Sequence, residues 1–284
     1  MQPAKFIAML AEYNLPKMLS ANFMIKYWII PAMLGFFLGW NSLAADLTIT
    51  NSPAPFDFAT PKVLTGKLYE IGSHRQKLLF NFRRTAERSG STVRVERKFF
   101  CPDGSLAAAE NVVYESGQFA SLQMKEFQAN VSGAIEVVPD SKKTGQSKLI
   151  VSYDHGLNPP KGDPQIFYPD TVQDDNLYTF MMNHWDELMR GDSVKFKFVA
   201  LEWKRTFGFR LVKICECVQD GTPLVQIKME PSNIFVAQLV NPLIFTVEKA
   251  EPHRIISYIG RTTPRIKRGK NWKYLDAETV FDWK

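Results

Sequence analysis

Apolar and polar residues alternate along most of this chain, from about residue 62 to its end, with the period of two that is typical of half-buried strands. Val194, Phe196 and Phe198, for example, alternate with two lysines. Turn sequences such as Cys101–Leu106, which contains Pro-Asp-Gly, separate these segments, because proline fixes φ and glycine accepts a positive φ. The pattern predicts about ten to twelve strands.

One segment, residues 176–190, has the helical period instead. Its apolar stripe consists of Leu177, Phe180, Met181, His184, Trp185 and Leu188. Asp174, Asp175 and Asn176 offer N-caps and negative charge at the start of this helix. Helix and strand do not alternate regularly, which argues against a parallel sheet. We therefore expect a mainly β fold, a curved antiparallel sheet or an incomplete β-barrel, with one substantial α-helix packed on it.

The strands and the helix belong to a single β-rich domain, residues 62–284. Residues 45–61 are rich in proline and serine and indicate an extended lead-in. Within the domain, residues 154–175 form an irregular loop with four prolines and five aspartates. A connection of roughly 20 irregular residues is unusual in a compact domain and is often a binding loop, a lid or a linker.

The N-terminal region contains an uncharged apolar run of 13 residues, Trp28–Trp40. A membrane-spanning helix needs about 20 residues, whereas the apolar core of a secretory signal has about 7–15. Small residues occupy the two positions that a signal peptidase reads before Ala45. We therefore expect residues 1–44 to be a signal peptide and the mature protein to be periplasmic or extracellular.

Two alternatives stay open for this region. An uncleaved run would leave the protein anchored at its N-terminus in the membrane. The segment before Met24 is also unusually long for a signal peptide, so translation starting at Met24 or Met18 would give a more conventional one.

The charge balance excludes one class of partner. Removal of residues 1–44 takes away three lysines and one glutamate, which lowers the net charge from +6 to +4. Such a small excess does not indicate nucleic acid as a partner. Aromatic residues make up 13% of the chain, including 21 phenylalanines, which is enough for a substantial core.

Three cysteines, Cys101, Cys215 and Cys217, are candidates for one disulfide in an oxidising compartment. Cys215 and Cys217 point to the same face if they lie on a strand. Either could pair with Cys101 if their strands are neighbours. The alternative is that all three are small buried hydrophobic residues.

Motifs that carry chemistry are absent from the sequence. There is no nucleophile elbow and no phosphate-binding glycine loop. We therefore expect no catalytic residue, no metal site and no cofactor. The alternative is a periplasmic hydrolase that uses the 154–175 loop, with His155 near Asp163 and Asp170.

A basic stretch near the C-terminus is a candidate contact site for an anionic membrane surface. Its charged members are Arg261, Arg265, Lys267, Arg268 and Lys270. The alternative is a solvated hairpin loop between two strands.

A second candidate site combines the helix with the strand after it. Apolar side chains there would line a space for an apolar ligand or lipid; they are Phe180, Met181, Trp185, Phe196 and Phe198. A cavity of about 300 Å³ or more would support this interpretation. The alternative is that these side chains pack on one another.

Three segments carry a family resemblance: GKLYEIGSHRQKLLFNF (66–82), CPDGSLAAAENVVYESGQF (101–119) and PHRIISYIGRTTPR (252–265). They resemble exported bacterial β-sheet proteins of unknown function. Such proteins are distantly similar to the open-barrel periplasmic lipoprotein carriers, whose curved sheet encloses acyl chains beneath a helix. The resemblance implies an exported envelope protein but no site residue.

Three functions remain as hypotheses. The first two are non-catalytic: a structural or interaction module of the cell envelope, and a binder of an apolar ligand or lipid. The third is the hydrolase described above. The oligomeric state is open.

Overall fold

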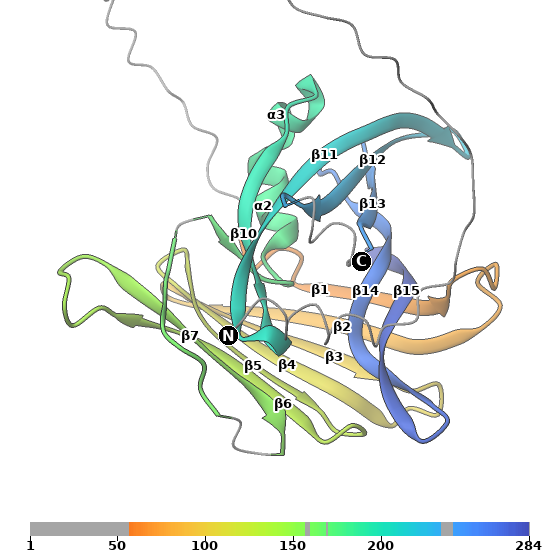
Figure 1. Cartoon of the computed structure of the whole chain (residues 1–284). Coiled ribbons are helices and arrows are strands. Elements are labelled where there is room, and N and C mark those ends of the chain that lie inside the picture. The colour runs from red at the N-terminus through yellow and green to blue at the C-terminus, as the bar shows by residue number, and fades with distance from the viewer. Residues whose placement is uncertain (1–56, 157–159, 169, 234–240, 284) are drawn as a thin grey trace, which may run out of the picture. The chain divides into compact units, whose positions relative to one another are not determined.

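The computed structural model describes residues 57–156, 160–168, 170–233 and 241–283, all within one compact unit. The expected signal peptide, the cleavage site and most of the lead-in lie outside these residues. The described residues contain fifteen strands in a single sheet, two α-helices and a turn of 3-10 helix, η1 (Figure 1).

In chain order the elements are β1 (Val63–Glu70), β2 (Leu78–Ser89), β3 (Thr92–Phe100), β4 (Leu106–Glu115), β5 (Gln118–Glu126), β6 (Val131–Pro139), β7 (Ser147–His155), β8 (Gln165–Ile166), β9 (Thr171–Val172), α2 (Leu177–Asn183), α3 (Trp185–Arg190), β10 (Val194–Ala200), η1 (Leu201–Trp203), β11 (Arg205–Gln219), β12 (Thr222–Pro231), β13 (Leu243–Glu248), β14 (Ile255–Arg268) and β15 (Asn271–Trp283).

The sheet is built by two meanders that meet in its interior, where the first strand, β1, pairs with the last, β15. The chain runs outward from β1 to β8, which forms one edge. It continues with β9 at the opposite edge and returns strand by strand to β15, which pairs with β1. All pairs are antiparallel except β9 with β10. The mainly β prediction and the curved antiparallel sheet are therefore confirmed, with more strands than the sequence pattern indicated.

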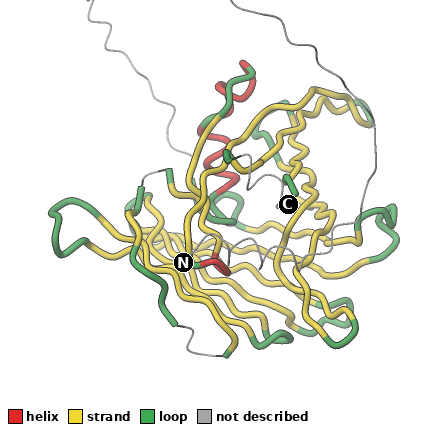
Figure 2. The backbone as a smooth tube through the Cα atoms, in the orientation of Figure 1, coloured by secondary structure: helices red, strands yellow, loops and turns green. Residues whose placement is uncertain are grey.

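The two edges of the sheet lie near each other because the chain joins them directly. Ile166 ends β8 and Thr171 begins β9, so five Cα steps connect opposite edges. These steps reach at most about 19 Å. A flat sheet of fifteen strands would be far wider, since neighbouring strands lie about 4.8 Å apart. The sheet therefore curls, and Figure 2 shows the helices beside β10 and β11 while the sheet remains open.

A side chain links edge strand β8 to the other half of the sheet, beside η1 and at the start of β11. The amide of Gln165 donates a hydrogen bond to the carbonyl oxygen of Lys204 at 2.9 Å and accepts one from the backbone N–H of Thr206 at 2.9 Å. The stretch expected as an irregular loop, residues 154–175, thus contains both edge strands and this link. Its other described residues after His155 form no named helix or strand, so the stretch is a largely irregular connection that contains two short edge strands.

The expected single helix over residues 176–190 is two short helices. His184 separates them, with φ −113° and ψ 20°, outside the helical region. Its N–H bonds the carbonyl of Met181, three residues back, so the first helix ends in a tighter turn. The apolar stripe still faces the sheet: Leu177, Met181, Trp185 and Leu188 are buried in both helices.

Asp174 and Asp175 do not cap α2. The residue at the N-cap position is Asn176, which makes no side-chain capping bond. Its side chain accepts a hydrogen bond from the N–H of Gln173 instead. Asp175 has other partners, which are described below together with the position of Asp174.

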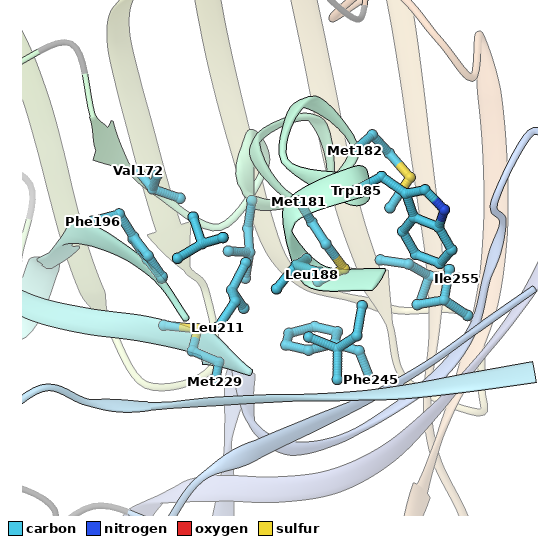
Figure 3. Close-up of a cluster of buried hydrophobic side chains, with 14 of the residues drawn as sticks. Val172, Met181, Met182, Trp185, Leu188, Phe196, Leu211, Met229, Phe245 and Ile255 are labelled. Carbon is cyan, nitrogen blue, oxygen red and sulfur yellow. The ribbon is translucent and has the colours of Figure 1, made fainter. Parts of the chain in front are cut away.

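The core consists of three clusters along the inner face. One lies between the helices and β10–β14, and Figure 3 shows Met181, Leu188, Leu211 and Phe245 among its side chains. A second is built by β3–β7, and a third by β1, β2 and β15 with their neighbours. None of the helices in the described part of the chain has the length and apolar character needed to cross a membrane.

Candidate functional site

A cavity of about 120 Å³ lies between α2 and the central strands of the sheet. Its apolar wall includes Leu64, Phe82, Leu177, Leu243, Phe245, Ile255, Phe281 and Trp283. Its polar wall includes Arg84, Arg97, Asp174, Asp175, Tyr258, Arg261, Thr262 and Thr263. The cavity is thus lined by both apolar and charged side chains, and the Arg97 guanidinium lies over the Phe82 ring at 5.7 Å from its centroid.

The charged wall begins as a row of residues that crosses neighbouring strands. Trp283 of β15 is paired with Leu64 of β1, and Leu64 with Arg84 of β2. Arg84 is paired with Arg97 of β3, and Arg97 with Glu110 of β4. Residues paired across an antiparallel sheet share a face. Two arginines therefore lie directly opposite each other on the inner face, where they require negative partners.

Asp175 is the partner of Arg84. Two guanidinium nitrogens of Arg84 bond the two carboxylate oxygens, at 2.8 and 3.3 Å. The remaining donors bond the carbonyl oxygens of Pro61 and Phe58. Burial alone would raise the pKa of Asp175, but the charge and hydrogen bonds of Arg84 outweigh it and hold that pKa below its usual value. This buried pair ties the segment before α2 to β2.

Tyr114 and Gln173 hold Asp175 in place. The Tyr114 hydroxyl donates to the second carboxylate oxygen at 2.8 Å and accepts from the Gln173 amide at 2.9 Å. The N–H of Asp175 in turn donates to the Gln173 side chain. The Tyr114 ring is stacked on Phe58 at 4.0 Å between centroids. The carboxylate of Asp175 is therefore fully used and is not open to a ligand.

Glu110 is the partner of Arg97, at 2.6 Å. Burial raises the pKa of Glu110 to about 7, with Arg97 opposing the shift and the negative charge of Asp174 adding to it. The Glu110 side chain is 3% exposed and is not part of the cavity wall. Glu110 therefore pairs with Arg97 from the neighbouring strand β4 and is not exposed to the cavity.

Asp174 differs from its neighbour. Asp174 lines the cavity and is exposed to solvent. In the described part of the chain, no hydrogen bond or ion pair within conventional distance holds its side chain. Surrounding protein raises the pKa of Asp174, Arg97 opposes that shift and Asp175 reinforces it. Asp174 is thus a carboxylate that faces the cavity without a partner of its own.

The apolar wall is built from aromatic residues. Phe82 and Phe281 meet edge to face at 5.9 Å between centroids, and Tyr178 of α2 packs on Trp283 at 5.4 Å. The indole N–H of Trp283 donates to the carbonyl of Ile255 at 2.7 Å, which leaves only its carbon framework toward the cavity. Such a surface suits the apolar body of a ligand.

The five residues predicted to line a ligand site are elsewhere. Met181, Trp185 and Phe196 are buried in the cluster between the helices and the sheet, and Phe180 and Phe198 pack against it. Phe180 and Phe196 are 5.0 Å apart between ring centroids. None of the five belongs to the cavity wall. Their contacts are those of the alternative interpretation, in which they pack on one another.

The basic stretch divides into two groups. Arg261 pairs with Asp276, and Arg265 is buried and bonds Glu126 and Tyr153. Lys267, Arg268 and Lys270 are exposed on the hairpin between β14 and β15. Arg261 is exposed as well, so the structure leaves four of the five predicted residues at the surface and buries Arg265.

Cys101, Cys215 and Cys217 are all free thiols. Cys101 follows β3, whereas Cys215 and Cys217 lie on β11, and six strands separate β3 from β11 in the sheet. The condition for pairing with Cys101, adjacent strands, is therefore not met. Cys215 and Cys217 are exposed, which does not fit the alternative of three buried side chains.

The side chains proposed for a hydrolase are not in the cavity wall. His155 and Asp163 are exposed, and the cavity includes neither of them nor Asp170. The described residues contain no group of three His, Cys, Asp or Glu side chains that could hold a metal ion.

No family model, no curated protein and no solved structure matches this chain. The geometry and charge of the cavity are therefore the basis for a functional proposal. Sequence reasoning missed this cavity because its wall comes from residues 60 to 283, and no local pattern joins Arg84 or Arg97 to Asp174. Two adjacent aspartates before a helix were the available signal, and they resembled N-caps.

Proposed function

We propose that this protein is an exported, non-catalytic binding protein of the cell envelope, and that its ligand is a small amphipathic molecule held in the cavity between α2 and the central strands. The observation that carries the proposal is that one cavity is lined both by aromatic and by charged side chains. Binding sites for small molecules are typically apolar with a few polar groups that fix orientation.

The size of the cavity limits the ligand. Its volume is about 120 Å³. An apolar cavity of about 150 Å³ holds benzene, whereas sites for drug-sized molecules have about 300–1,000 Å³. The space therefore suits one ring or a short alkyl group, either as a whole ligand or as part of a longer molecule. This proposal is narrower than the lipid carrier suggested by the sequence resemblance.

A substitution that fills the cavity tests the proposal. Leu243 lies on the cavity wall and is half-buried, so Leu243→Trp fills the space while part of the side chain stays near solvent. Ile244→Trp, on the other face of β13, is the matched control because Ile244 is also half-buried and is not in the wall. Benzyl alcohol and benzylamine serve as probes, with affinity measured by calorimetry.

We expect Leu243→Trp to weaken probe binding at least tenfold, while Ile244→Trp binds as the unchanged protein does. Equal affinities in all three proteins, with both variants folded, would refute a ligand site in the cavity.

Export has its own test. The protein purified from the envelope of its own host should have the intact mass of residues 45–284, without residues 1–44. Retention of these residues would contradict cleavage and would favour the N-terminal anchor instead.

A further inference from the structure

Arg97 differs from the other arginines of the cavity wall in how far its donors are used. Among the described residues the wall has three arginines and two aspartates, a formal surplus of one positive charge. Arg84 bonds Asp175 and two backbone carbonyl oxygens. Arg261 is exposed and pairs with Asp276. The third arginine, Arg97, therefore decides which polar group the wall accepts.

The guanidinium of Arg97 keeps one side open. In the described part of the chain it donates one hydrogen bond, from Nη1 to Glu110 at 2.6 Å, although a guanidinium has five N–H donors in a fixed fork. Its Nε and Nη2 bond no acceptor there, and neither atom is among the polar atoms that are buried without a partner. Both atoms are therefore accessible to solvent, and Arg97 lines the cavity.

Arg84 shows what this side of a guanidinium binds. Its Nε and Nη2 hold the two carboxylate oxygens of Asp175, at 2.8 and 3.3 Å. Arg97 is paired with Arg84 on the neighbouring strand, so the same fork recurs one strand away without a protein carboxylate on it. Bidentate pairs of arginine with a carboxylate are among the strong hydrogen-bonded contacts in proteins.

We infer that the cavity binds small monocarboxylic acids with an aromatic or short alkyl body, and that Nε and Nη2 of Arg97 hold the carboxylate. The inference rests on the proposed binding function and names its ligand class. Such an acid supplies the two acceptors that the fork lacks, and its negative charge balances the positive surplus of the wall. An ammonium group has only donors, which the fork cannot bind.

The negative groups near Arg97 leave this fork available. The charges that act on Arg97 are those of Glu110, Asp174, Asp175 and Tyr258. Asp175 is already bound by the neighbouring arginine, and Asp174 is exposed to solvent, which screens its charge. Burial raises the pKa of Glu110 to about 7, so near pH 6 most of Glu110 is protonated and does not compete with a ligand.

Aromatic side chains surround the place where the body of the acid would lie. The Arg97 guanidinium is 5.7 Å from the centroid of Phe82, and Phe281 meets Phe82 edge to face at 5.9 Å. Both rings line the cavity together with Phe245 and Trp283. A single ring or short alkyl group bound beside Arg97 is therefore in contact with carbon atoms, which suits an acid such as benzoate.

Three probes of nearly equal size separate charge from shape: benzoate, benzyl alcohol and benzylamine. Calorimetry near pH 6 keeps benzoate charged and Glu110 mostly protonated. We expect benzoate to bind at least tenfold more tightly than benzyl alcohol, and benzylamine to bind no more tightly than the alcohol. In Arg97→Gln the preference for benzoate over the alcohol should fall to less than twofold.

Arg94→Gln is the matched control, because Arg94 is an exposed arginine of the same strand and is not in the cavity wall. It should keep the benzoate preference of the unchanged protein. The Nε–H signals of the arginines give a second readout in the unchanged protein, which does not depend on the folding of a variant. Benzoate should shift the Arg97 signal more than the Arg84 signal, since the Arg84 fork is filled by Asp175.

The outcomes distinguish the ligand class from the binding function. Equal binding of benzoate and benzyl alcohol, a benzoate preference that survives Arg97→Gln, or an Arg97 signal that benzoate leaves in place would overturn the assignment of acids and leave the binding function standing. Failure of all three probes to bind would overturn the binding function itself, and the assignment with it.

Discussion

Arg84 and Arg97 lie directly opposite each other on β2 and β3, on the inner face of the sheet. Like charges at paired positions destabilise two neighbouring strands. Asp175 and Glu110 compensate for this, one from the segment before α2 and one from the next strand. The charge arrangement of the cavity therefore also holds the helices against the sheet.

Substitution of Arg84 tests this structural role. Arg84→Met leaves the Asp175 carboxylate buried without its cation, which should lower the free energy of unfolding by about 3–5 kcal/mol. Arg190→Met is the control, because the Arg190–Asp192 pair is exposed and should contribute less than about 1 kcal/mol. Urea unfolding of the three proteins gives both values. Similar losses in the two variants would contradict the role of the buried pair.

Glu110 makes stability depend on pH. Its pKa is raised from 4.5 to about 7 in the folded protein, so between these values the folded state holds a proton that the unfolded chain has lost. Stability from this group is therefore complete below about pH 4.5 and is lost as the pH rises through 7. Glu110→Gln lacks this titration.

The comparison of the two proteins isolates the effect of Glu110. The free energy of unfolding of the unchanged protein, less that of Glu110→Gln, should fall from about pH 5 to about pH 8. Denaturant titrations at intervals across this range give the difference. A difference that is constant or rises with pH would show that Glu110 has no raised pKa in the folded state.

Gln165 links edge strand β8 to the start of β11 through two backbone groups near η1. Gln165→Ala leaves the Lys204 carbonyl and the Thr206 N–H without these partners, and should cost about 1–3 kcal/mol. Gln118→Ala, at an exposed position of β5, is expected to change stability by less than about 0.5 kcal/mol. Amide hydrogen exchange should also quicken in β8 and η1. Unchanged exchange there would mean that the link does not hold β8 to the start of β11.

The exposed hairpin between β14 and β15 remains a candidate for contact with an anionic surface. Lys267→Ser with Arg268→Ser removes two charges, each worth about 1 kcal/mol near such a membrane, so vesicle binding should weaken roughly thirtyfold. Lys142→Ser with Lys143→Ser removes two exposed lysines elsewhere. Co-sedimentation with anionic vesicles distinguishes the two. Equal binding by both double variants would remove the hairpin from consideration.

The sequence predicted the sheet well because a half-buried strand has a local signature. The alternation at Val194, Phe196 and Phe198, for example, corresponds to β10. The helical stripe was also real, and Met181, Trp185 and Leu188 are buried as the period requires. The sequence pattern missed the break at His184 because the spacing of apolar residues carries no information on the backbone angles of a single residue.

The site was not predictable from the sequence in the same way. Arg84 and Asp175 are 91 positions apart, and only the return of the chain across the sheet brings them together. The adjacent aspartates, read as helix caps, proved to have separate surroundings: Asp175 is buried against Arg84, while Asp174 faces the cavity. Local periodicity describes elements, whereas a cavity depends on how distant elements pack.

Methyl NMR of the whole protein tests the central claim most directly. Titration with benzyl alcohol should shift the methyl signals of Leu177, Leu243 and Ile255, which line the cavity, and leave those of Leu188 and Leu211 in the packed cluster nearly unchanged. Shifts confined to Leu188, Leu211 or surface methyl groups, or no shifts at millimolar probe, would contradict a ligand site between α2 and the central strands.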